Sequence, residues 1–233
     1  MTHKDILLNK IAGNLIVSCQ ARPGWAMYGP NIMAAFAVAA QEGGAVAIRA
    51  TGKENIQAIK NKVSLPILGI NKIFNPDYPV YITPTYESAK EILDIGIEII
   101  ALDATDRARP NNETFESIVE KIRLNYPDTL IMGEVSTLEE AKSILNLDID
   151  LISTTLSGYT QESEDVHGVN FKLIETIKKI TDIPVIAEGK IESPEEAVMA
   201  LQSGAFAVVV GTSITRPEII TSRYANSLKR MKG

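Results

Sequence analysis

The stretch PILGINK, at residues 66–72, decides how this sequence is interpreted. It opens as an apolar, β-branched run that is typical of a buried strand, and it ends in a lysine. Seven similar runs occur along the chain, separated by amphipathic segments of helical periodicity such as YESAKEILDIG (86–96). The eight predicted strands are NLIVSCQ (14–20), AVAIRA (45–50), PILGINK (66–72), IIALDA (99–104), TLIMGEV (129–135), LISTTL (151–156), PVIAEG (184–189) and AVVVG (207–211).

The order of these runs predicts the fold. Each interval leaves room for one helix and two loops, the connection that parallel strands require. Strands this apolar need cover on both faces, which flanking helices provide. Eight strand–helix units without a linker therefore predict an α/β fold in which residues 1–233 form a single (β/α)8 TIM barrel. The alternative is a doubly wound open sheet, but SCQARPGW (18–25) is not the glycine-rich loop that usually follows its first strand.

Composition excludes several classes of function. The net charge of -6 argues against nucleic-acid binding, which relies on basic surfaces. No apolar run is long enough to span a membrane, and the start of the chain is too polar for a secretory signal. The single cysteine, Cys19, excludes an internal disulfide and favours the cytoplasm. Only two histidines occur, His3 and His167, so we expect acid–base chemistry to rest on carboxylates or lysine.

Polar side chains stand at the carboxyl ends of seven predicted strands, the end that carries the active site in this fold. Side chains alternate along a strand, so a Lys72 that points into the barrel mouth places Ile70 in the core and Asn71 toward the helices. The same alternation turns Cys19 outward, where we expect it to pack. The seven residues are Gln20, Arg49, Lys72, Asp103, Glu134, Thr155 and Glu188.

The segments after the last two predicted strands indicate a barrel of the phosphate-binding type. AEGK (187–190) and VVVGTSITRPEII (208–220) combine glycines, whose N–H groups can approach an anion closely, with the start of a short helix. Barrels often bind phosphate with these two loops. A plain strand-to-helix turn is the alternative. The predicted phosphate-binding residues are Gly189, Lys190, Gly211, Thr212, Ser213 and Arg216.

Eight motifs together resemble a known family, the N-acylglucosamine-6-phosphate 2-epimerases, also called N-acetylmannosamine-6-phosphate epimerases. The resemblance runs from about residue 12 to residue 224. The motifs are LIVSCQA (15–21), GGAVAIRA (43–50), LPILGINK (65–72), YITPT (81–85), IALDAT (100–105), STTLSGYT (153–160), IPVIAEG (183–189) and VVVGTSITRP (208–217).

The resemblance implies an isomerase of bacterial sialic-acid catabolism that inverts C2 of an amino-sugar phosphate without a metal or nucleotide cofactor. It assigns the catalytic lysine and glutamate of the family to Lys72 and Glu188, and substrate positioning to Gln20 and Arg49. It also implies a homodimer. The closing helix expected in RPEIITSRYANSLKRMKG (216–233) carries an apolar stripe that could close the barrel or meet a partner.

The chain departs from the family pattern at four places. Ile73 replaces the arginine that usually follows the strand-three lysine, and Gly133-Glu134 replaces alanine–aspartate. Gly211-Thr212 replaces a glycine pair, and RPGWAMYGPN (22–31) lacks the usual His-Ser-Ser. The last change lies in a loop over the barrel mouth, so it bears on how the sugar is recognised.

Epimerisation at C2 needs two proton-transfer groups on opposite faces of the carbon and donors for the developing negative charge. Lys72 and Glu188 are predicted as that pair, which requires a lowered pKa for Lys72. Gln20, Arg49, Glu134 and Thr155 are expected to bind the sugar, and Asp103 to bind a hydroxyl or orient Lys72. Two alternatives are a Schiff-base aldolase acting through Lys72 and a non-catalytic sugar-phosphate-binding barrel.

The long segment SGYTQESEDVHGVN (157–170) predicts either a lid or a solvated surface loop. As a lid, it would turn its acidic residues outward and leave Tyr159 and Thr160 facing the sugar.

Overall fold

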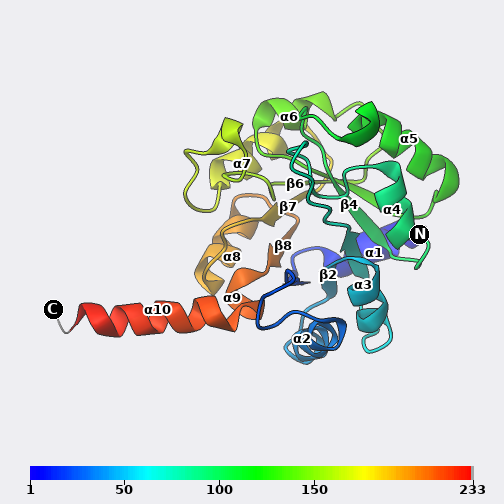
Figure 1. Cartoon of the computed structure of the whole chain (residues 1–233). Helices are drawn as coiled ribbons and strands as arrows, with labels where there is room; N and C mark the ends of the chain where they lie inside the picture. Colours follow the sequence, from blue (N-terminus) through cyan, green and yellow to red (C-terminus); the bar gives the residue numbers. More distant parts are fainter. Residues whose placement is uncertain (232–233) are drawn as a thin grey trace.

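The computed structural model describes residues 1–231 and confirms the eight-stranded barrel (Figure 1). All neighbouring strands are parallel, and β8 pairs with β1 to close the sheet, with Ile16 opposite Val209. The sequence order of the strands is also their order around the barrel. The strands are β1 (Leu15–Cys19), β2 (Ala47–Thr51), β3 (Ile67–Ile70), β4 (Ile99–Asp103), β5 (Leu130–Glu134), β6 (Leu151–Ser153), β7 (Val185–Glu188) and β8 (Ala207–Val210).

Helices surround the sheet (Figure 1). Several begin at a threonine whose hydroxyl accepts a hydrogen bond from a backbone N–H of the first turn, as at Thr85, Thr114 and Thr137. The α-helices are α1 (His3–Ile11), α2 (Pro30–Glu42), α3 (Lys53–Lys60), α4 (Tyr86–Leu93), α5 (Phe115–Asn125), α6 (Leu138–Ser143), α7 (Phe171–Ile180), α8 (Pro194–Gln202), α9 (Thr212–Thr215) and α10 (Pro217–Arg230); short 3-10 helices span Pro110–Asn112 and Gln161–Ser163.

The alternation expected along the strands is confirmed. Ile70 belongs to the apolar cluster inside the barrel, whereas the Asn71 amide donates hydrogen bonds to the Ser88 carbonyl and the Glu91 carboxylate of α4. Cys19 packs in the outer layer between sheet and helices, where burial raises the pKa of its thiol to about 12. Cys19 is therefore a packing residue with a protonated thiol.

Helix α1 seals the end of the barrel at which the strands begin. Its Leu7 and Ile11 are buried in the same apolar cluster as Ile16, Leu68 and other interior residues. The opposite end, where the strands finish, is left open for loops and polar side chains.

Helix α10 extends away from the barrel instead of closing it (Figure 1). No residue between Pro217 and Arg230 is buried, and Tyr224 and Leu228 of the expected apolar stripe are exposed. The last two residues of the predicted helix, 232–233, lie outside the described residues. None of the helices within residues 1–231 has the length and apolarity needed to cross a lipid bilayer.

An apolar groove lies on the outside of the barrel beside β8 and α8. It has a volume of about 370 Å³ and is lined mainly by aliphatic side chains, among them Val198, Leu201, Val208 and Ile214. In a barrel with a complete outer ring of helices, a helix that follows β8 would cover this groove. Helix α10 does not cover it.

Candidate active site

A cavity of about 360 Å³ opens at the carboxyl ends of the strands. The barrel brings twelve of the fourteen predicted site residues to its lining, from segments that are far apart in the sequence. The twelve are Gln20, Arg49, Lys72, Thr155, Tyr159, Glu188, Gly189, Lys190, Gly211, Thr212, Ser213 and Arg216. The other two, Asp103 and Glu134, are fully buried beneath or beside it.

Arg49 is the centre of a buried ion-pair cluster at the base of the cavity. Its guanidinium is only 2% exposed and contacts two carboxylates, Glu134 Oε1 at 2.5 Å and Glu188 Oε1 at 3.1 Å. The second oxygen of Glu188 accepts a hydrogen bond from the Thr155 hydroxyl at 3.2 Å. Such contacts hold the carboxylate of Glu188 in one orientation while leaving it at the cavity surface.

The cluster brings the pKa values of Lys72 and Glu188 close together. Burial, followed by the nearby positive charge of Arg49, lowers the pKa of Lys72 to about 8. Burial raises the pKa of Glu188 to about 7, against the opposing effect of Arg49. Both groups can therefore exchange a proton near neutral pH, as general acid–base catalysis requires.

Three polar atoms of this region are buried without a hydrogen-bond partner among residues 1–231: Gln20 Oε1, Arg49 Nε and Glu134 Oε2. Gln20 is otherwise fixed by a 2.6 Å hydrogen bond from its Nε2 to Ser18 Oγ. Buried polar atoms without partners are costly in a folded protein, and near a cavity they are natural contacts for a polar ligand.

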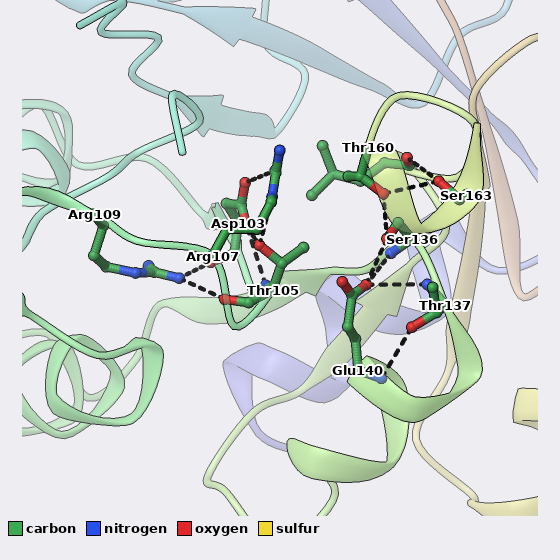
Figure 2. A network of polar contacts seen from close by, with 10 residues as sticks. Asp103, Thr105, Arg107, Arg109, Ser136, Thr137, Glu140, Thr160 and Ser163 are labelled. Carbon is green, nitrogen blue, oxygen red and sulfur yellow. Dashed lines mark hydrogen bonds and ion pairs between the residues drawn. The ribbon is translucent and has the colours of Figure 1, made fainter. Parts of the chain in front are cut away.

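Asp103 has other partners than those expected. Its carboxylate accepts hydrogen bonds from the Thr105 hydroxyl at 2.6 Å and pairs with Arg107 NH2 at 2.6 Å (Figure 2). The next arginine, Arg109, donates to the Asp103 and Thr105 carbonyls. Asp103 therefore stabilises the segment after β4, and within residues 1–231 no contact supports the expectation that it orients Lys72.

The loops after β7 and β8 form one wall of the cavity. Gly189 has a φ of +107°, a backbone conformation that favours glycine, and Gly211 packs so closely on Ser18 that an added Cβ would lie 3.2 Å from the serine Cβ. The Thr215 hydroxyl fastens α9 to the Ser18 carbonyl at 2.8 Å. The first N–H groups of α9 have no acceptor within that helix.

Lys190 lines the cavity, yet its amine points to the loop after β6. Nζ donates hydrogen bonds to the carbonyls of Gly158 and Val166 and lies 5.1 Å from the centroid of the Tyr159 ring. The side chain thus fastens that loop, and only the backbone of Lys190 remains for the predicted phosphate role.

The loop at residues 157–170 is anchored at several points. Ser163 Oγ accepts a hydrogen bond from the Gly158 N–H, and Thr160 Oγ1 bonds to Ser163 and Ser136 at 2.9 Å (Figure 2). Thr160 is buried, so the expectation that it faces the sugar is wrong: its hydroxyl is committed to these serines. Tyr159 does line the cavity and is 55% exposed.

A family model described as "Putative N-acetylmannosamine-6-phosphate epimerase" matches residues 33–230. The chain belongs to this family.

Relatives within the epimerase family match almost the whole chain. A "Putative N-acetylmannosamine-6-phosphate 2-epimerase" of Caldanaerobacter subterraneus is 46% identical over 226 residues, which covers 97% of this chain and 95% of the relative. One of Listeria monocytogenes is 43% identical and covers 97% and 98%. A solved structure of the N-acetylmannosamine-6-phosphate 2-epimerase of Clostridium perfringens is 45% identical, with a TM-score of 0.92 and coverage of 97% and 98%.

More distant structures share the fold alone. Thiamine phosphate pyrophosphorylase of Pyrococcus furiosus is 18% identical and has a TM-score of 0.59, with coverage of 90% of this chain and 89% of its own. The epimerase family therefore has a barrel architecture that other enzymes also use.

Four cavity residues were missed by sequence reasoning. Arg22, Trp25 and Tyr81 come from segments that follow strands, where no periodicity predicts a side chain's direction, and Arg223 lies in α10. Residues 22–31 depart from the family pattern and Tyr81 opens the motif YITPT, so these positions carried a signal, whereas Arg223 carried none.

Proposed function

We propose that this chain is an N-acetylmannosamine-6-phosphate 2-epimerase, which converts that sugar phosphate to N-acetylglucosamine 6-phosphate. One observation carries the proposal. Lys72 and Glu188, on opposite sides of the barrel, both line the cavity, and burial brings their pKa values toward each other. Family membership and the names of the relatives support the same conclusion.

The chemistry follows from the acidity of the C2 hydrogen. In the open-chain sugar, C2 is next to the C1 aldehyde, so loss of the C2 proton moves the electron pair onto the C1 oxygen as an enolate. Neutral Lys72 or ionised Glu188 accepts the proton on one face, and the conjugate acid of the other residue returns a proton on the opposite face. The configuration of C2 is inverted, and the two residues have exchanged protonation states. The reverse reaction starts from this opposite distribution, whereas a second forward turnover first requires the pair to exchange protons with solvent.

Buried Arg49 supports the charge changes in this cycle. It keeps a positive charge beside Glu188 throughout and would stabilise the negative charge that develops on the C1 oxygen. Glu134 pairs with Arg49 through one carboxylate oxygen, and its other oxygen has no hydrogen-bond partner among residues 1–231. We assign Gln20 and Thr155, which line the cavity, to contacts with the hydroxyl and acetamido groups of the sugar. Glu134 does not line the cavity, so we assign it to holding Arg49 in place.

The phosphate is assigned to the loops after β7 and β8. Glycine backbones at Gly189 and Gly211, the first turn of α9 and Arg216 supply N–H donors on one wall of the cavity. The unphosphorylated sugar should then react far more slowly, in kcat as well as in kcat/KM, because remote binding energy orients the reacting carbon. Equal kcat/KM values for the two sugars would remove the phosphate assignment.

The direct experiment is proton NMR of N-acetylmannosamine 6-phosphate with the enzyme in deuterated water. We expect the C2 proton signal to disappear while signals of N-acetylglucosamine 6-phosphate grow without a C2 proton. Unchanged spectra at high enzyme concentration would overturn the proposal.

A Schiff-base aldolase is the second candidate, because the lowered pKa of Lys72 would also suit an amine nucleophile. Borohydride treatment in the presence of the sugar phosphate separates the two. An aldolase is trapped as a covalent adduct of Lys72, whereas an epimerase working by proton transfer is recovered with unchanged mass and activity.

We further propose that residues 1–233 act as one domain of a cytoplasmic homodimer. The exposed apolar residues of α10 and the uncovered groove beside β8 support this, since α10 of one copy could cover the groove of the other. The single buried cysteine fits a reducing compartment.

A further inference from the structure

Cations and aromatic rings alternate along one side of the cavity mouth. The Cζ atom of Arg216 lies 3.8 Å from the centroid of the Trp25 ring, and that of Arg22 lies 5.6 Å from it. Arg22 Cζ also lies 4.7 Å from the centroid of Phe74, which stacks on Tyr81 at 5.1 Å. We call these five residues the cation–aromatic ladder.

The ladder connects the loops after β1, β3 and β8. Two parts of it are held in place by other contacts. Phe74 and Tyr81 belong to a hairpin that begins at Lys72, in which the Ile73 N–H donates to the Tyr81 carbonyl at 2.9 Å. Trp25 is partly buried against the core cluster between sheet and helices. Arg22 is exposed, and it lies between the ring of Trp25, which packs on the core, and the ring of Phe74, which stacks on Tyr81.

The guanidinium of Arg22 lies near two aromatic rings, and no carboxylate of the described residues neutralises it. Within residues 1–231, Arg22 has no carboxylate partner, whereas Arg216 uses its Nε to bind Glu218 at 2.7 Å. A cation–π contact uses none of the N–H donors of a guanidinium as hydrogen bonds, so those of Arg22 stay free for an anion. A planar donor edge of this kind matches the oxygens of a phosphate group.

We propose that Arg22 binds the phosphate of the substrate together with Arg216, and that Trp25 and Phe74 position it for this role. The inference rests on the proposed function and adds a phosphate ligand from the loop after β1. Both arginines line the cavity that contains the loops assigned to phosphate. It also accounts for Phe74, an apolar residue left 55% exposed.

The ladder includes residues from the places where this chain departs from the family pattern. Arg22 and Trp25 belong to the stretch at 22–31, and Phe74 follows Ile73. A phosphate contact from this loop is therefore expected to be a feature of this chain and of relatives that carry the same residues.

Calorimetric titration with inorganic phosphate tests the role of Arg22 without any turnover. We expect Arg22→Gln to raise the Kd for phosphate by about tenfold or more, the size of a lost hydrogen bond to a charged group. Lys62→Gln removes the same charge from the loop before β3, at the opposite end of the barrel, and should leave the Kd within about twofold. Phosphate binding by Arg22→Gln that equals that of the wild type, or no binding by the wild type, would overturn the inference.

The positioning role of Trp25 has its own measurement. Trp25→Leu removes the ring, and we expect KM for the sugar phosphate to rise about fivefold while the slow turnover of the unphosphorylated sugar stays the same. Trp25→Phe keeps an aromatic face and should restore most of the lost affinity. Equal behaviour of the two variants would contradict a stacking role.

The two proposals fail in different ways. A wild type that binds phosphate but does not exchange the C2 proton contradicts the epimerase function, and the titration of Arg22→Gln still decides the inference. An active wild type whose Arg22→Gln variant keeps normal KM and phosphate affinity contradicts the inference alone.

Discussion

Lys72 and Glu188 are the residues on which the proposed chemistry depends. We expect Lys72→Ala and Glu188→Ala each to lower kcat by ~10²-fold to 10⁴-fold or more, because each removes one of two proton-transfer groups. Neither side chain belongs to the apolar core, so thermal unfolding should change little. Steady-state rates and calorimetry check both points. Lys62→Ala serves as a control, and activity within about tenfold of the wild type in either variant would contradict the assignment.

The same two residues, Lys72 and Glu188, set the expected pH dependence of the reaction. The active pair holds one proton, so activity falls below about 7, where both groups are protonated, and above about 8, where both have lost their protons. This holds whichever residue begins as the base. We expect a narrow bell-shaped profile of kcat/KM between these values, measured from about pH 5.5 to 9.5. A rate that keeps rising to the alkaline end would exclude Lys72 or Glu188 as the required acid.

At the scale of elements, the loop at residues 157–170 offers a test of its anchoring. Gly158 has a φ of +77°, and an added Cβ would collide with the Val166 carbonyl and the Lys190 amine. We expect Gly158→Ala to lower the free energy of unfolding by about 1–3 kcal/mol and to speed proteolysis within the loop. Gly168 lies in the same loop with open space around its Cβ position. Gly168→Ala should therefore behave as the wild type, and equal effects of the two substitutions would contradict the anchoring.

Tyr159 is the side chain that this loop presents to the cavity. We expect Tyr159→Ala to lower kcat/KM by about tenfold or more, the scale of one lost oriented contact. Replacing the exposed acids Glu162, Glu164 and Asp165 with serine should have little effect. If the triple serine variant is crippled and Tyr159→Ala is normal, the acidic residues contact the substrate or a partner.

At the scale of the whole molecule, helix α10 has exposed apolar residues and no cover within residues 1–231. Light scattering of the wild type should give the mass of a dimer. Leu228→Glu places a charge on the apolar stripe and should shift the population toward monomer, because burying an unpaired charge is costly. Ser222→Glu, on the opposite face of α10, is the matched control. A monomeric wild type, or a dimer unaffected by Leu228→Glu, would contradict the proposed assembly.

Much of this molecule could be predicted from its sequence for a simple reason. A strand of alternating side chains, followed by a helix of suitable length, specifies its own direction and its own inner and outer faces. The eight strands, the inward direction of Ile70 and the outward direction of Asn71 and Cys19 follow from that local pattern. The same pattern placed Lys72, Arg49 and Glu188 at one end of the barrel.

The tertiary structure alone decided which polar groups meet there. Asp103 pairs with Arg107, Lys190 binds the loop after β6, and Thr160 binds Ser136, because each group finds partners that no periodicity predicts. Arg22 reaches Phe74 only when the loops after β1 and β3 lie side by side. Local periodicity determines the face on which a side chain lies, whereas the partner of a polar group depends on distances between segments far apart in the chain.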